Sequence, residues 1–122
     1  MFYDNLTVGA GDSVTVTVTA TSTTTGTVTI KNNSNGESVT STVSSSAALC
    51  EQDAEWIVED FFYGDSVTHL ADWQTITWTG AVAKTASTSV APSSGYTVDL
   101  DQSGKILSSS SLSSSSVTIK YV

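Results

Sequence analysis

Residues 12–21 read DSVTVTVTAT, and this stretch decides the fold class. Val14, Val16 and Val18 alternate with threonines at 15, 17 and 19, so apolar and hydroxyl side chains fall on opposite faces of an extended chain. Strict alternation of β-branched residues is the strongest sequence signal for a strand. We therefore predict a strand with one apolar face and one hydroxyl face.

The neighbouring segments extend this strand into a sheet. GTVTIKN (26–32) and ESVTSTV (37–43) have the same composition, and the cluster Asn32-Asn33-Ser34-Asn35-Gly36 between them is typical of a chain reversal. This order predicts an antiparallel meander. Further strands are predicted at 54–62, 73–83, 84–90, 95–100, 104–108 and 116–122, with the serine-rich run 108–116 as a polar hairpin that joins the last two.

Short strands at this spacing indicate an all-β protein, a sandwich or a barrel. No segment has a convincing helical pattern. A length of 122 residues is that of one domain with a single core, so we expect residues 1–122 to form one domain.

The charge composition argues against several classes of partner. The net charge is −8 and the chain has only four basic residues, so it lacks the basic patch that binds nucleic acid or an anionic membrane. No run approaches the ~18 apolar residues of a membrane span. Neutral hydroxyls far outnumber the carboxylates, which suits work at low pH, because protonating so few carboxylates releases little internal repulsion.

Residues that bind metals or act as nucleophiles are scarce. Cys50 is the one cysteine, so it is either a buried small hydrophobe or a link to another chain. His69 is the one histidine, and we expect it in a surface loop. We therefore predict no metal, no cofactor and no Ser-His or Cys-His nucleophile. Glycosylation sequons at Asn5 and Asn32 are left open, since such motifs arise by chance in Ser/Thr-rich chains.

Residues 49–62 read LCEQDAEWIVEDFF and depart from the Ser/Thr background. If 54–62 is a strand, Glu55 and Glu59 share a face with Ile57 and Phe61. A glutamate held among apolar and aromatic groups can act as a general acid or base under acidic conditions. The alternative is an edge strand whose acidic residues face solvent and discourage aggregation.

This segment resembles the glutamic peptidases, or eqolisins, which are acid-acting endopeptidases. The family pattern is a Leu-Cys pair, a short polar stretch, and then Ala-Glu-aromatic-Ile-aliphatic-Glu-Asp-Phe, which stand here at 49–50, 51–53 and 54–61. GDSVTVTVTATS (11–22), TITWTGAVA (75–83) and the closing Tyr-Val also match in character. The resemblance runs over nearly the whole chain. It implies an antiparallel β-sandwich of two curved sheets, jelly-roll or concanavalin-like, with substrate across the concave sheet.

The resemblance also implies roles for individual residues. Glu59 corresponds to the catalytic general base that activates a water for attack on the scissile amide. Glu55, which shares the face of Glu59, and the neighbouring Trp56 are predicted to shape the site. In the family a glutamine, which orients the water and stabilises the oxyanion, lies well upstream, and neither Gln52 nor Gln74 matches its motif. The sequence thus resembles the C-terminal two-thirds of a glutamic peptidase. We expect the chain alone to be inactive or weakly active, and its location to be secreted and extracellular.

Three functions stay open at this point. The chain is one part of an acid endopeptidase acting on polypeptides, with a second chain or self-association completing the sandwich and a glutamine supplied from outside this chain. Alternatively it is a non-catalytic β-sandwich module that forms an oligomer or filament by strand exchange at open edges. The third reading, a Thr-x-Thr surface for sugar or ice, is disfavoured because only one strand is regular in sequence.

Overall fold

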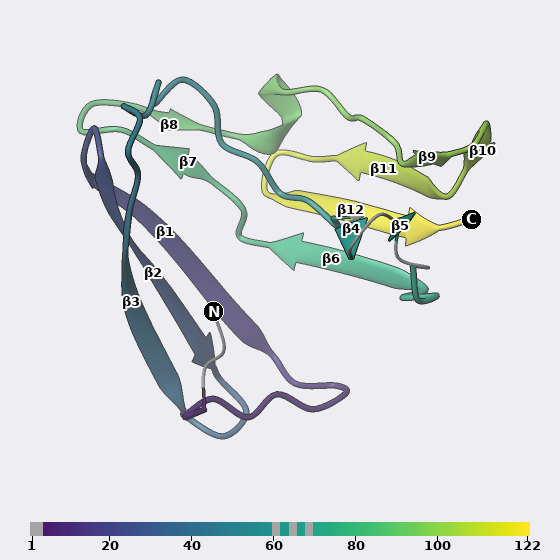
Figure 1. Cartoon of the computed structure of the whole chain (residues 1–122), viewed down its shortest axis with the longest axis horizontal. Helices are drawn as coiled ribbons and strands as arrows, with labels where there is room; N and C mark the ends of the chain where they lie inside the picture. Colours follow the sequence, from purple (N-terminus) through teal and green to yellow (C-terminus); the bar gives the residue numbers. More distant parts are fainter. Residues whose placement is uncertain (1–3, 60–61, 64–65, 68–69) are drawn as a thin grey trace. The chain divides into compact units, whose positions relative to one another are not determined.

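The computed structural model describes residues 4–59, 62–63, 66–67 and 70–122, and they form antiparallel sheets (Figure 1). The chain divides into two compact units, residues 1–53 and 54–122. The one helical element among the described residues is a 3-10 turn at Pro92–Ser94. No helix in this part of the chain is long and apolar enough to cross a membrane. That residues 1–122 form one domain stays a prediction.

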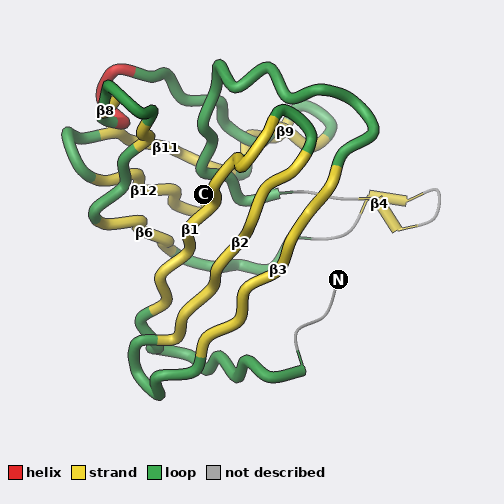
Figure 2. The backbone as a smooth tube through the Cα atoms, turned by 90° about the vertical axis from the view of Figure 1, so that its left-hand side faces the viewer, coloured by secondary structure: helices red, strands yellow, loops and turns green. Residues whose placement is uncertain are grey.

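The first unit is a three-stranded meander (Figure 2). Its strands are β1 (Val14–Ser22), β2 (Thr25–Asn32) and β3 (Ser38–Ser44), in the order β1-β2-β3. All three lie where the sequence predicts them, and the Asn-rich cluster forms the β2–β3 turn. The pairing register has an irregularity between Ala20 and Ser22, where the first hairpin closes.

The register gives this sheet two chemically distinct faces. Thr17 pairs with Thr29, which pairs with Thr40, and the hydroxyls of the latter two are 2.8 Å apart. The next row is Thr19, Thr27 and Thr42, while Val16, Ile30 and Val39 form a row on the opposite face. The hydroxyl pattern therefore covers three strands rather than the one that is regular in sequence.

Position 26 requires a glycine, because the backbones of β1 and β2 approach each other closely there. A Cβ atom added at this position would lie 2.8 Å from the backbone oxygen of Thr19 on the neighbouring strand. Real Cβ atoms do not come so close, so any side chain here would move one strand away from the other.

The second unit is built on the sheet β11-β12-β6. These strands are β6 (Thr75–Thr79), β11 (Ser108–Leu112) and β12 (Ser116–Tyr121). Six strands of two residues each complete the unit as three two-stranded sheets. β4 (Phe62–Tyr63) pairs with β5 (Ser66–Val67), β7 (Ala83–Lys84) with β8 (Ser89–Val90), and β9 (Asp101–Gln102) with β10 (Lys105–Ile106). Among the described residues no sheet closes into a barrel.

The core of the second unit lies on one side of β12. Val117 and Ile119 are buried together with Ala81, and Trp73 and Trp78 pack against this cluster. The Trp73 indole N–H donates to the Ile119 carbonyl at 3.3 Å. The Trp73 ring also meets the ring of Tyr121 edge to face, with centroids 5.1 Å apart.

Several predicted strands in this unit are wrong in extent. Residues 54–59 and 95–100 carry no strand, and 84–90 contributes one strand of the β7–β8 hairpin and the end of the other. The sequence predicts the serine run 108–116 as a connecting hairpin, but Ser108–Leu112 is itself a strand and only residues 113–115 form the turn. Serine has little intrinsic preference for strands, so pairing with the apolar strand β12 stabilises the extended conformation of this segment.

Candidate functional site

The segment 54–59 opens the second unit as extended chain without a strand ladder. Trp56 and Val58 are half-buried and pack against the core cluster of Ala81, Val117 and Ile119. Glu55, Ile57 and Glu59 are exposed (the remaining acidic and aromatic neighbours, Asp60 and Phe61, lie outside the described residues). The predicted alternation of faces therefore holds over 55–59, although the predicted strand does not.

Segment 54–59 packs two apolar side chains on one side, and Glu59 lies on the opposite side. Trp56 and Val58 anchor the segment because their burial removes large apolar surfaces from water. Glu59 then projects outward one residue beyond Val58, and Glu55 shares its face. The Glu59 side chain is exposed, and Phe61, one of the apolar residues predicted on the same face, lies outside the described residues. The predicted roles of Glu59, Glu55 and Trp56 stay predictions.

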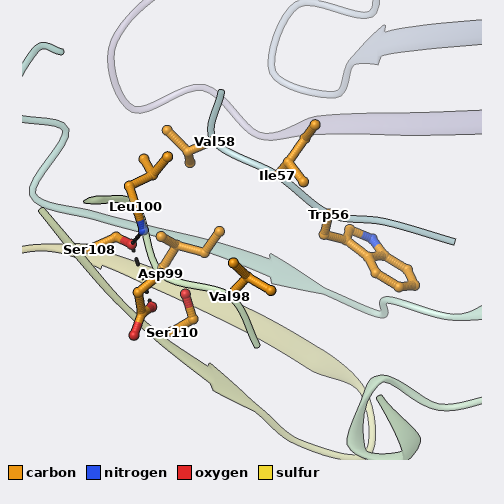
Figure 3. Close-up of a pocket in the computed structure, with 9 residues that line it drawn as sticks. Trp56, Ile57, Val58, Val98, Asp99, Leu100, Ser108 and Ser110 are labelled. Atoms are coloured by element: carbon orange, nitrogen blue, oxygen red, sulfur yellow. Dashed lines mark hydrogen bonds between the residues drawn. The ribbon is translucent and has the colours of Figure 1, made fainter. Parts of the chain in front are cut away.

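The same segment borders a pocket of about 190 Å³ (Figure 3). Trp56, Ile57 and Val58 contribute one wall, and the others come from 98–100, Ser108, Ser110 and Ile119. The Ser108 hydroxyl is buried, accepts from the backbone N–H of Leu100 at 2.7 Å and lies 3.4 Å from an oxygen of Asp99. Glu59 is not among the residues that line this pocket.

Sequence reasoning missed Ser108 as a buried polar group. Its low-complexity surroundings gave no signal, because one serine of the run is indistinguishable from the next. The register supplies the distinction: Ser108 pairs with Tyr121 on β12, which places it beside the core rather than in the turn.

The two glutamines have other surroundings. Gln74 is exposed, has a left-handed backbone (φ 57°), and its carbonyl accepts from the Tyr121 N–H at 2.8 Å. Gln52 is exposed in the first unit. The prediction that neither Gln52 nor Gln74 corresponds to the catalytic glutamine of the family stays a prediction.

The other two candidate residues of the sequence are Cys50 and His69. Cys50 is exposed, so its interpretation as a buried hydrophobe is wrong. His69 lies outside the described residues. Within the described part of the chain, no group of three or more His, Cys, Asp or Glu side chains could hold a metal ion.

One carboxylate of the first unit is strongly hydrogen-bonded. Asp12 Oδ2 accepts from the Gly9 backbone N–H at 2.8 Å and from the Asn32 side-chain amide at 2.7 Å. These bonds stabilise the ionised carboxylate, the Gly9 bond most, and they lower the pKa of Asp12 below its ordinary value. The Asn-rich turn thus supplies an anchor as well as the predicted reversal.

Comparison with known proteins places these features in a family. The model of the peptidase A4 family matches residues 1–121. Aspergillopepsin-2 of Aspergillus niger is 43% identical over 122 residues, which is 98% of this chain and 43% of that protein. The chain therefore spans less than half the length of this curated relative.

Solved structures agree with the sequence match. The crystal structure of aspergilloglutamic peptidase from Aspergillus niger has a TM-score of 0.92 at 43% identity, covering 98% of this chain and 72% of that one. Scytalido-glutamic peptidase, solved with a peptide-based transition state analog, has a TM-score of 0.84 at 28% identity, covering 96% and 62%. SCP-B, a member of the eqolisin family solved in a complex with the tripeptide Ala-Ile-His, has a TM-score of 0.86 at 28% identity. The match covers 96% of this chain and 63% of that one.

These neighbours confirm the all-β class that the alternating strands predict and the antiparallel β-sandwich that the family resemblance implies. The family match over 1–121 includes the whole of the LCEQDAEWIVEDFF segment. The chain belongs to the peptidase A4 family, the glutamic peptidases.

Proposed function

We propose that this chain carries the general-base half of an extracellular, acid-acting endopeptidase whose glutamine comes from outside the chain. The observation that carries the proposal is the position of Glu59. It stands in the segment that resembles the family's catalytic motif, and it is presented outward by a segment whose other side is anchored in the core.

The proposed chemistry needs only a carboxylate, a water and a donor for the oxyanion. The Glu59 carboxylate takes a proton from the water, whose oxygen adds to the scissile carbonyl carbon of a polypeptide substrate. The external glutamine holds that water and donates to the negatively charged oxygen of the tetrahedral intermediate. The proton then passes from Glu59 to the departing amine as the C–N bond breaks. Glu55 shares the outward face and shapes the site, and Trp56 supports the segment from within.

The test is proteolysis of an unfolded protein substrate at acid pH by this chain, alone and with a Gln-bearing segment of a glutamic peptidase added. We expect activity to need the added segment, because losing one oxyanion donor costs roughly 10²–10³-fold in rate. Glu59→Gln removes the base without changing the side chain's size and should lower the rate by roughly 10²–10⁴-fold.

Glu51→Gln is the matched control, since Glu51 is also exposed but lies near the C-terminal end of the first unit, outside segment 54–59. It should leave the rate unchanged. Activity that survives Glu59→Gln in the combined protein would refute the assignment.

A second candidate function is favoured by the exposed edge strand. All nine residues of β1 are exposed, and Val18 is 73% exposed although it lies on the apolar face of the sheet. An apolar hollow of about 220 Å³ is lined by Val18, Val28, Val43 and Leu49 among others. An exposed apolar edge invites pairing with another chain, so we propose assembly as the alternative. Sedimentation of the wild type and of Val18→Lys tests it: a wild-type monomer would exclude self-assembly.

A further inference from the structure

We propose that Asn5 accepts an N-linked glycan and that Asn32 is closed to this modification in the folded protein. Both stand in N-x-S/T sequons, Asn5-Leu6-Thr7 and Asn32-Asn33-Ser34, which sequence alone cannot tell apart. The extracellular location that gives access to a glycosylating pathway rests on the proposed function; the occupancy of the two asparagines does not depend on peptidase activity.

Asn32 uses its whole side-chain amide inside the fold. The residue is fully buried, and its Nδ2 donates to the Thr7 carbonyl at 2.8 Å and to Asp12 Oδ2 at 2.7 Å. Its Oδ1 accepts from the Ser34 N–H at 2.9 Å. A glycan replaces one of the two Nδ2 hydrogens, so one of these donated bonds would be lost. A sugar is also far too large for a position with no exposed surface.

Asn5 has the opposite surroundings. It is exposed in a turn with Asp4, and among the described residues its side chain makes no hydrogen bond that a glycan would break. The anchored part of the chain begins two residues later. The Thr7 N–H donates to Glu37 Oε2 at 2.7 Å, and the Thr7 carbonyl accepts from Asn32 and, at 3.3 Å, from Asn35.

The two sequons are therefore joined by a hydrogen bond in the native state. The Asn32 amide holds the carbonyl of Thr7, the hydroxyl residue of the first sequon. A glycan on Asn5 leaves this bond intact because it leaves the turn into solvent. A glycan on Asn32 would cost either the bond to Thr7 or the bond to Asp12, and both of these residues lie in the segment that precedes β1.

The transfer itself needs a lipid-pyrophosphate-linked oligosaccharide, which a secretory pathway supplies. The Asn5 Nδ2 attacks the anomeric carbon of the sugar, forming the N-glycosidic bond. The bond from that carbon to the pyrophosphate oxygen breaks, the lipid pyrophosphate leaves, and Nδ2 loses one proton.

The test is secretion of the full chain from yeast behind a signal peptide, followed by peptide mapping of the folded fraction before and after enzymatic glycan release. We expect the glycan on the peptide that contains Asn5 and unmodified Asn32. Asn5→Gln and Thr7→Ala should each abolish the glycan, since both destroy the first sequon while keeping the backbone bonds of Thr7. Ser34→Ala destroys the second sequon with Asn32 in place and should leave Asn5 occupancy unchanged.

Two results would overturn the proposal: a glycan on Asn32 in the folded fraction, or an unmodified Asn5 in both the wild type and Ser34→Ala. Thermal unfolding of the secreted wild type against Thr7→Ala confirms that the fractions compared are folded.

Discussion

Replacing Val117 with threonine tests whether the β12 face is the core of the second unit. The two side chains have nearly the same shape, so the change introduces a hydroxyl and little else. Val117 is 4% exposed, and its paired neighbours are Leu112 and Trp78, whose side chains offer that hydroxyl no acceptor. An unsatisfied buried hydroxyl costs about 1–3 kcal/mol.

In a unit of this size each kcal/mol lowers Tm by roughly 4–8 °C. All three tryptophans of the chain, at 56, 73 and 78, belong to residues 54–122, so tryptophan fluorescence on heating reports this unit. Val98→Thr is the control, because Val98 lies in the same unit and is 79% exposed. Its Tm should stay close to that of the wild type, since exposed substitutions change stability by less than about 0.5 kcal/mol. Equal Tm values for Val117→Thr and Val98→Thr would refute this account of the core.

Three further predictions address the first unit and the proposed site. Gly26→Ala should destabilise the β1–β2 hairpin, because the added Cβ would lie 2.8 Å from the Thr19 backbone oxygen; Gly9→Ala, whose Cβ meets nothing closer than 3.7 Å, should not, and far-UV circular dichroism on heating compares them. The pKa of Asp12 is lowered by folding, so its contribution to stability is present above the ordinary value of 3.8 and is lost as pH falls through the folded pKa. Asp12→Asn should therefore be less stable than wild type at neutral pH, and the difference should close in strong acid; a gap that is independent of pH would contradict this. Ile57 is 58% exposed on the outward face, so in the combined peptidase assay Ile57→Ala should raise KM while leaving Tm unchanged, and an unchanged KM would remove it from the substrate surface.

The first three strands are predictable because their residues agree with the pairing at every level. Valine and threonine alternate, both favour strands, and the Asn-rich cluster suits the turn, so local preference and register point the same way. The number of strands that share the hydroxyl face was not predictable, since it depends on register rather than on any one segment.

The second unit is less predictable because tertiary contacts override local preference. The serines at 108–112 form a strand only by pairing with β12. Residues 54–59 have strand-like alternation, but side-chain packing of Trp56 and Val58 holds them extended without a ladder. Alternation reports which side is buried, and it does not report whether a neighbouring strand is present.

The candidate site was predicted from its motif and not from its physical surroundings. Glu59 is recognisable from the residues around it, whereas its exposure depends on which side of the segment the core takes up. The burial of Asn32 was equally unpredictable, because nothing in the sequence of the Asn-rich turn indicates that this amide is fully buried.

The hydroxyl face of β1–β3 has a consequence for solubility in acid. The isoelectric point of the chain is about 4.1, so near that pH molecules lose the mutual repulsion that a net charge provides. The rows that run from Thr17 through Thr29 to Thr40, and from Thr19 through Thr27 to Thr42, do not titrate in this range. We therefore expect this hydroxyl surface to bind water as well at about pH 4 as at about pH 7, and to oppose association when the net charge no longer does.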